Sequence, residues 1–141
     1  MTIEIPESHV KRISLHSKES QPIEACGILI GTTRHDVRKV IDTWPAKNRL
    51  SSESSYEIDP ESLFNAFTYA EKNSLEVIAF YHSHPFWSAE ASAIDRARAN
   101  YPGLSYVIYS IPNKEIKSFY FDGKELHSES VIVTADEHLS T

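Results

Sequence analysis

The chain has 141 residues and a formal net charge of −6, and 40% of its residues are hydrophobic. This size and composition fit one folded domain, and an acidic chain without a Lys/Arg cluster does not suit nucleic acid as the main partner. A single cysteine excludes a disulfide scaffold. We find no secretory signal and no apolar run near the length of a membrane span, so we expect a soluble, cytoplasmic protein that does not bind membranes.

The first half of the chain predicts one helix and several strands. Apolar residues at helical spacing indicate the helix, with Val10, Ile13 and Leu15 facing inward. Runs of β-forming residues indicate strands, the second pairing with the first across the turn at 33–35. The predicted elements are a helix from Pro6 to about Ser17, strands at Cys26–Thr32 and Asp36–Trp44, a polar loop at Asn48–Ser55 and a short strand at Tyr56–Ile58.

A second helix is predicted to start after Asp59 and to end near Asn73. Asp59 is a good N-cap and Pro60 suits the first helical turn. The residues expected on its buried face are Leu63, Phe64, Phe67 and Ala70.

The second half of the chain predicts a buried strand, a third helix and an antiparallel meander. The expected ranges are a strand at Leu75–Tyr81 leading into His82, a helix from Ser92 to about Asn100, strands at Leu104–Ile111, Glu115–Phe121 and Leu126–Val133, and a flexible tail at 135–141. We therefore expect an α+β fold in which one domain, residues 1–134, has a mixed central sheet flanked by helices.

The motif with the clearest chemistry is His82-Ser83-His84-Pro85, followed after six intervening residues by Ser92-Ala93-Ile94-Asp95. Side chains two apart on a strand point to the same face, so His82 and His84 can bind one ion. Two histidines and a carboxylate form the ligand set of a catalytic zinc, whose fourth position stays open. Ser92 and Asp95 also fit a helix N-cap with an acid in the first turn, a purely structural pattern that is compatible with metal binding.

These residues resemble the signature of the JAMM metalloproteases, the MPN-domain group that cuts ubiquitin-like proteins from their conjugates. The signature has an upstream Glu in a context like P-x-E-x-C-G, and Gln21 to Gly31 match it around Glu24. The resemblance extends from about Ile3 to about Thr134. Ala91 departs from the pattern, which commonly has a proline there. The resemblance implies an MPN (JAMM) domain with cytidine-deaminase-like layering.

The resemblance also implies a role for each residue of the motif. His82, His84 and Asp95 would bind one Zn²⁺ per chain, and no other cofactor is implied. Glu24 would act as general base and then general acid, and Ser92 would stabilise the oxyanion. Zinc lowers the pKa of bound water to about 7, and an amine leaving group still needs a proton.

Several of these residues have simpler interpretations. Glu24 could be an ordinary solvated acid at the edge of an element. Cys26 is expected to be a buried, inert thiol, because no partner spacing supports another role. Phe86 and Trp87 could belong either to the core or to a substrate groove next to the metal ligands.

The chain lacks the insertions of relatives that are selective for polyubiquitin linkages, and so resembles the minimal bacterial and archaeal type. That type implies hydrolysis after the C-terminal Gly-Gly of a small ubiquitin-like or sulfur-carrier protein. An inactive MPN-type scaffold is the alternative, although such relatives usually lose ligands that this chain keeps. A zinc deaminase would need the P-C-x-x-C signature, which is absent, and the acidic charge argues against a DNA-repair branch with H-N-H-P. The carrier, the type of bond and the oligomeric state stay open.

Overall fold

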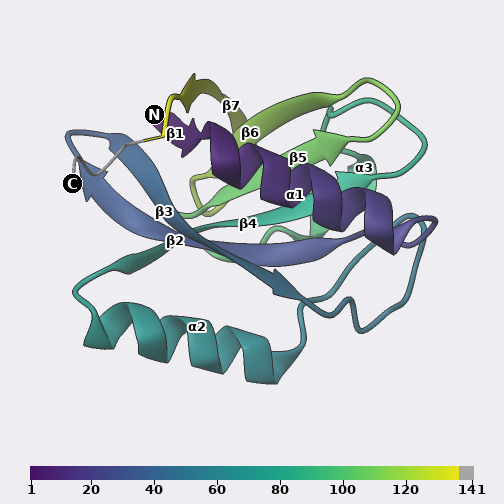
Figure 1. Cartoon of the computed structure of the whole chain (residues 1–141). Helices are drawn as coiled ribbons and strands as arrows, with labels where there is room; N and C mark the ends of the chain where they lie inside the picture. Colours follow the sequence, from purple (N-terminus) through teal and green to yellow (C-terminus); the bar gives the residue numbers. More distant parts are fainter. Residues whose placement is uncertain (137–141) are drawn as a thin grey trace.

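A computed structural model describes residues 1–136 of the chain. Across this range, seven strands form one mixed sheet and three helices pack around it (Figure 1). The elements are β1 (Thr2–Pro6), α1 (Glu7–Ser20), β2 (Cys26–Arg34), β3 (Val37–Ala46), α2 (Pro60–Lys72), β4 (Glu76–His84), α3 (Ala93–Arg98), β5 (Ser105–Ser110), β6 (Glu115–Phe121) and β7 (Leu126–Thr134).

The sheet closes into a barrel in the order β1-β3-β2-β4-β5-β6-β7. Strand β1 closes it by pairing in parallel with both β3 and β7. No strand is predicted at residues 2–6, and the expected central sheet flanked by helices is corrected by this closure: the sheet is mixed, as expected, but closed. The alternating pattern that marks β1 as a strand covers only five residues, which is too short to be recognised with ease. Its two apolar residues, Ile3 and Ile5, are fully buried.

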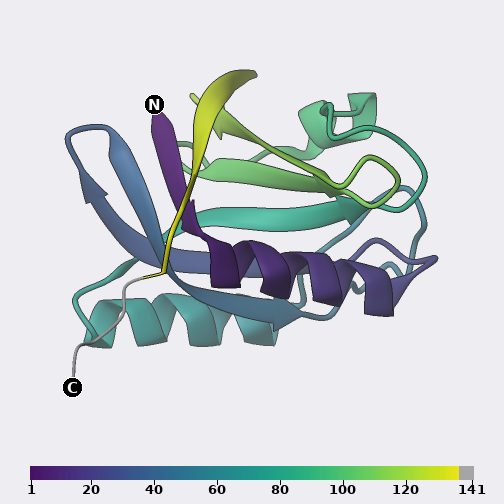
Figure 2. The same ribbon diagram turned by 45° about the horizontal axis from the view of Figure 1, so that its top comes forward.

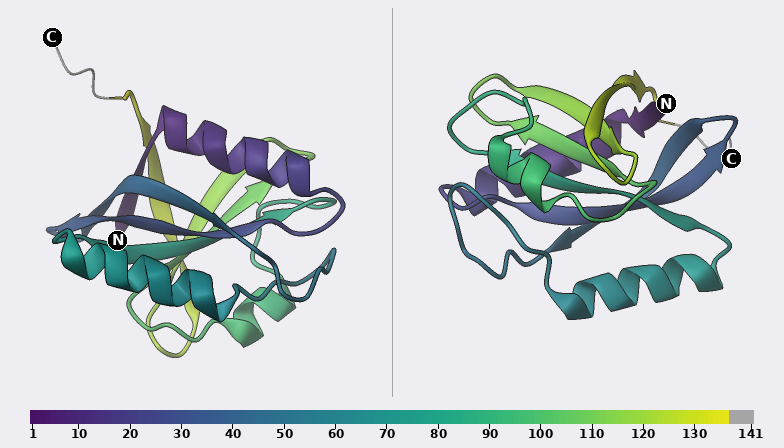
Figure 3. Two further views of the ribbon diagram at one scale, coloured as in Figure 1. Left: turned by 60° about the horizontal axis from the view of Figure 1, so that its bottom comes forward. Right: turned by 180° about the vertical axis from the view of Figure 1, so that it is seen from behind.

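Two hydrophobic clusters cover the two faces of the sheet. Ile13 of α1 packs with Leu29, Val40 and Tyr81 in one cluster. The other contains Ala66 and Ala70 of α2 with, among others, Ile28, Phe80 and Ile108. Figure 2 and Figure 3 show α1 and α2 on opposite sides of the strands between them. Strand β4 is buried on both faces and therefore lies at the centre of the molecule.

The helices form as predicted, but parts of their buried faces were assigned wrongly. Leu15 is 60% exposed, because it lies about 200° around the helix from buried Ile13. Phe64 and Phe67 of α2 are 70% and 40% exposed, which corrects the prediction for these two residues. Ala70 is buried, as predicted, and Ala66 is buried as well.

The start of α2 follows the prediction closely. The Asp59 side chain accepts a hydrogen bond from the Ser62 amide, and Pro60 occupies the first helical turn. The cap therefore fixes the point at which the chain enters α2 from the preceding loop.

A buried ion pair lies inside the barrel, where Arg38 of β3 meets Glu129 of β7 with nitrogen–oxygen distances of 2.8 and 3.1 Å. Ser105 of β5 and Ser118 of β6 donate hydrogen bonds to the same carboxylate. Arg38 also donates to the carbonyl of Ile78 in β4. Five strands are thus connected through two side chains.

The predicted meander is confirmed as the antiparallel series β5-β6-β7. The short strand expected at Tyr56–Ile58 is reduced to a single bridge between Asn48 and Ile58. Ala135 and Asp136, assigned to the tail, are described, and Asp136 accepts hydrogen bonds from the amide and hydroxyl of Ser8. The rest of that predicted tail, 137–141, lies outside the described residues. Among the helices of residues 1–136, none is long and apolar enough to cross a membrane.

Candidate metal centre

Strand β4 brings the two motif histidines onto one face of the sheet. His82 pairs with Cys26 of antiparallel β2 on one side and with Ile108 of parallel β5 on the other. His84 lies two residues further along and is paired with Ser110. Both imidazoles are almost completely buried. Their positions are therefore fixed by the centre of the sheet.

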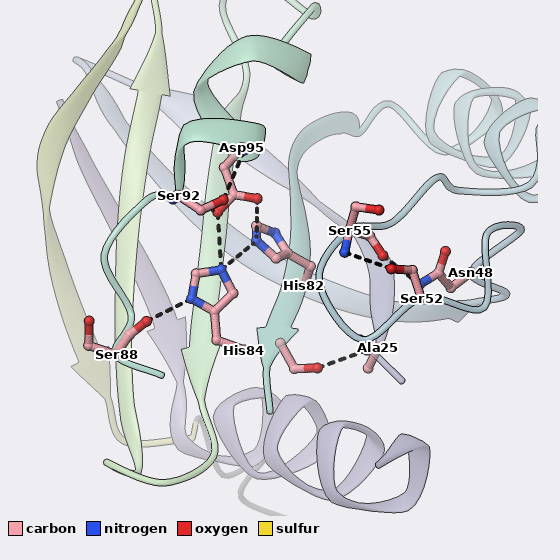
Figure 4. A network of polar contacts seen from close by, with 10 residues as sticks. Ala25, Asn48, Ser52, Ser55, His82, His84, Ser88, Ser92 and Asp95 are labelled. Atoms are coloured by element: carbon pink, nitrogen blue, oxygen red, sulfur yellow. Dashed lines mark hydrogen bonds and ion pairs between the residues drawn. The ribbon is translucent and has the colours of Figure 1, made fainter. Parts of the chain in front are cut away.

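Asp95 reaches the histidines from the first turn of α3. Its Oδ1 lies 3.0 Å from His82 Nε2, and its Oδ2 lies 3.0 Å from His84 Nε2 (Figure 4). The two Nε2 atoms are 3.3 Å apart. Ser92 forms a capping box with Asp95, in which each backbone amide donates to the other side chain. Capping and convergence on the histidines therefore occur together, as the sequence analysis expected.

The two histidines are held by different contacts. His84 Nδ1 lies 2.7 Å from the Ser88 carbonyl, which can only accept, so Nδ1 carries the proton of this hydrogen bond. Within residues 1–136, His82 Nδ1 has no hydrogen-bond partner. The ring of Tyr56 stacks on the His82 ring instead, with centroids 4.5 Å apart and an interplanar angle of 23°.

Glu24 lies just before β2 and is not the solvated acid of the simpler interpretation. It is 1% exposed, and its Oε1 has no hydrogen-bond partner in the described part of the chain. Burial, and then repulsion from Asp95, raise its pKa to about 8. The next residue is anchored to β4, because the Ala25 amide donates to Ser83 Oγ at 2.8 Å and the Ala25 carbonyl accepts from the Ser83 amide.

The carboxyl of Asp95 has the opposite electrostatic environment. Burial opposes its ionisation, but attraction to His82 and hydrogen bonds from both imidazoles and the Ser92 amide outweigh burial, so its pKa lies well below the ordinary range. Two neighbouring carboxyl groups are thus driven to different protonation states. Such a pair is typical of sites where one group binds a cation and the other moves a proton.

Ser92 accepts at Oγ from the Asp95 amide at 3.0 Å. That bond uses a lone pair of the hydroxyl, so its hydrogen stays able to donate to another acceptor. The geometry is therefore compatible with the oxyanion role expected for Ser92.

The residues with open interpretations are also placed. Phe86 and Trp87 are 53% and 42% exposed, which excludes the core alternative. The Trp87 ring lies 6.1 Å from that of His84, centroid to centroid. Cys26 is fully buried, and burial, Asp59 and Glu24 raise its pKa to about 12, so the thiol is inert, as expected.

Two residues near the centre were missed by sequence reasoning. Tyr56 was assigned to a short strand, and Asn48 to a polar loop. Asn48 is buried, and its side chain makes four hydrogen bonds with described residues, including one from its amide to the Glu24 carbonyl. Its place in a polar, Ser-rich segment gives no periodic signal, so a loop asparagine with this role could not be distinguished from an ordinary turn residue.

The closed mixed barrel and this group of side chains define a JAMM/MPN-type domain. Comparison with known families agrees: Prok-JAB, described as prokaryotic homologs of the JAB domain, matches residues 6–122. The chain belongs to this family.

Several known proteins are similar to this chain over most of its length. A desampylase of Haloferax volcanii is 35% identical over 79% of this chain and 79% of its own length. A probable TtuB-protein conjugate cleaving protease of Thermus thermophilus is 30% identical over 77% of this chain and 70% of its own. The solution structure of a protein from Desulfitobacterium hafniense has a TM-score of 0.86 and 31% identity, covering 95% of this chain and 94% of that one.

Proposed function

We propose that the protein is a zinc-dependent peptidase or isopeptidase that hydrolyses the bond after the C-terminal Gly-Gly of a small ubiquitin-like or sulfur-carrier protein. The observation that carries the proposal is the convergence of His82, His84 and Asp95 beside the buried Glu24, whose Oε1 has no hydrogen-bond partner within residues 1–136. The names of the similar proteins support this substrate class.

The donor set fits zinc in chemistry and in spacing. Ligands about 2.0–2.1 Å from a tetrahedral ion are separated from one another by about 3.3 Å. The two Nε2 atoms are 3.3 Å apart, and each lies 3.0 Å from an Asp95 oxygen. The Ser88 carbonyl orients one ligand in the way that metal-binding imidazoles usually require.

When bound, zinc would supply Lewis acidity and would lower the pKa of a water molecule to about 7. Glu24 would accept a proton from the attacking water and deliver it to the leaving amine, because its buried carboxyl lies close to Asp95 and has an oxygen, Oε1, without a hydrogen-bond partner within residues 1–136. Ser92 donates its hydroxyl hydrogen to the oxygen on which negative charge develops. The buried ligands exclude bulk water from this side of the reacting bond.

Glycine in the substrate is physically reasonable, because an extended tail near a buried centre must avoid bulky side chains. Phe86 and Trp87 would line the groove, since both are exposed and one lies against the ring of His84. The surface around the centre would thus recognise a folded carrier rather than any extended peptide.

Zinc analysis of the purified protein is the first test, and one zinc per chain is expected. Glu24→Gln should keep zinc near the wild-type level while turnover falls by a factor on the order of 10² to 10⁴. The same change at exposed Glu53 is the matched control. A protein that takes up no zinc on titration would point to the scaffold alternative, and loss of zinc in Glu24→Gln would make Glu24 a ligand.

The substrate is tested with carrier fusions that end in Gly-Gly-X and with Ala-Ala-X controls. We expect cleavage of the first set and little cleavage of the second or of unrelated extended peptides. Equal cleavage of both sets of fusions would mean that the groove does not recognise glycine.

A further inference from the structure

We infer that Tyr56 is a positioning residue for the metal centre, which holds the His82 imidazole in its ligating orientation by stacking on its face. The inference rests on the proposed function, because it assigns to Tyr56 an effect on metal binding. It concerns a residue outside the His82, His84 and Asp95 ligand set.

The contrast between the two histidines carries the argument. A ligating imidazole usually donates its second N–H to an oxygen, which fixes the rotation of the ring. His84 has this partner in the Ser88 carbonyl. His82 Nδ1 has none among residues 1–136, although it is buried. A ring without that hydrogen bond needs another restraint on its torsions.

Tyr56 supplies such a restraint from the loop that precedes α2. Its ring lies nearly parallel to that of His82, with the centroids 4.5 Å apart. Stacked aromatic pairs have a preferred geometry at this separation. A rotation of the His82 ring about χ2 would destroy the parallel contact, so the stack favours the orientation in which Nε2 faces Asp95.

The loop that carries Tyr56 is itself fixed on both sides by Asn48. The Asn48 side chain donates to the Ser55 carbonyl and accepts from the Glu57 amide, the two residues that flank Tyr56. The same side chain donates to the carbonyl of Glu24 at 3.0 Å. Figure 4 shows Asn48 and Ser55 in the loop beside His82. The buried side-chain amide of Asn48 therefore fixes the position of the loop at Tyr56 relative to the backbone of Glu24.

The test compares three variants by zinc affinity, measured by competition with a chromophoric chelator, and by the absorption spectrum of the Co²⁺-substituted protein. Tyr56→Phe keeps the ring and should bind zinc like the wild type. Tyr56→Leu keeps apolar bulk but removes the stack, and its affinity should fall by about 10- to 100-fold with an altered Co²⁺ spectrum. Tyr56 and Tyr101 both line a cavity of about 240 Å³. Tyr101→Leu is the matched control, because Tyr101 packs on Phe67 and Phe80 and not on a metal ligand.

The outcomes separate the inference from the proposed function. A wild-type protein that binds no zinc contradicts the proposed function. Wild-type zinc binding with equal affinity in Tyr56→Leu overturns the positioning role alone, as does an equal loss in Tyr101→Leu, which would indicate a general packing effect. If Tyr56→Leu does not fold, Tyr56→Met replaces it, because its flexible side chain can fill the same space.

Discussion

Glu24 is in an environment that suits chemistry better than stability. Its carboxyl is buried, its Oε1 has no partner within residues 1–136, and a second carboxyl, that of Asp95, lies close enough to repel it. Burying an ionisable group without a partner costs much more free energy when the group is charged than when it is neutral. The site therefore favours a protonated Glu24 in the metal-free protein.

This cost predicts a pH-dependent stability. The pKa of Glu24 is about 8 in the folded protein, above its usual value of 4.5. Between these pH values Glu24 loses its proton in the unfolded chain but keeps it in the folded protein. The contribution of Glu24 to the free energy of unfolding is therefore present below pH 4.5 and is lost as pH rises toward 8. At pH 8, metal-free Glu24→Gln should exceed metal-free wild type in free energy of unfolding by about 1 to 3 kcal/mol, measured by urea denaturation.

At pH 4.5 the two metal-free proteins should differ little, because Glu24 is then largely neutral when folded. Glu53→Gln, a change at an exposed position, should not reproduce the gain at pH 8. An identical difference at both pH values would contradict the assignment of the effect to ionisation of Glu24.

The residues of the centre could be chosen from sequence because their spacing follows from local geometry. His82 and His84 share a face on any strand, and Ser92 with Asp95 form a capping pair on any helix start. Tyr56 and Asn48 could not be found in this way. Their roles depend on loop contacts between residues far apart in the sequence, such as Asn48 with Glu24.

Among the elements, the strands of the barrel are connected by the buried pair of Arg38 and Glu129. Removing one partner of a buried pair leaves an uncompensated charge. Arg38→Met should therefore lower the free energy of unfolding by about 3 to 5 kcal/mol, while Arg38→Met combined with Glu129→Leu should recover much of that loss. Denaturant unfolding of the two single variants and the double variant measures the coupling. Purely additive losses would show that the charges do not interact.

Strands with a long run of β-forming residues were predicted well, whereas the residues on the buried faces of the helices were predicted less well. The regions now assigned to β4 and β6 have long runs of β-forming residues, whereas β1 has only five residues. On α2, hydrophobicity favoured Phe64 and Phe67 over Ala66 as the buried residues. Close packing of a helix on a sheet depends on side-chain size as well as polarity, and size selects the alanines.

For the whole molecule, the closed sheet and its two hydrophobic clusters predict a fold that does not require metal. Chelation, or the change His84→Ala, should remove zinc and activity but leave the far-UV circular dichroism and a cooperative thermal transition. The loss in Tm should depend on zinc concentration, because the ion stabilises only by binding the native state. Unfolding on chelation would instead identify the metal as a structural element.

Helix α3 has only six residues, from Ala93 to Arg98, and a helix of that length is not stable alone in water. Its first turn is held by the carboxyl of Asp95, which also faces the two histidines. With the proposed function, zinc binding and the formation of α3 are therefore thermodynamically linked. Amide hydrogen exchange in α3 should slow when zinc is bound, and escape of the ion would be limited by how often this one turn opens.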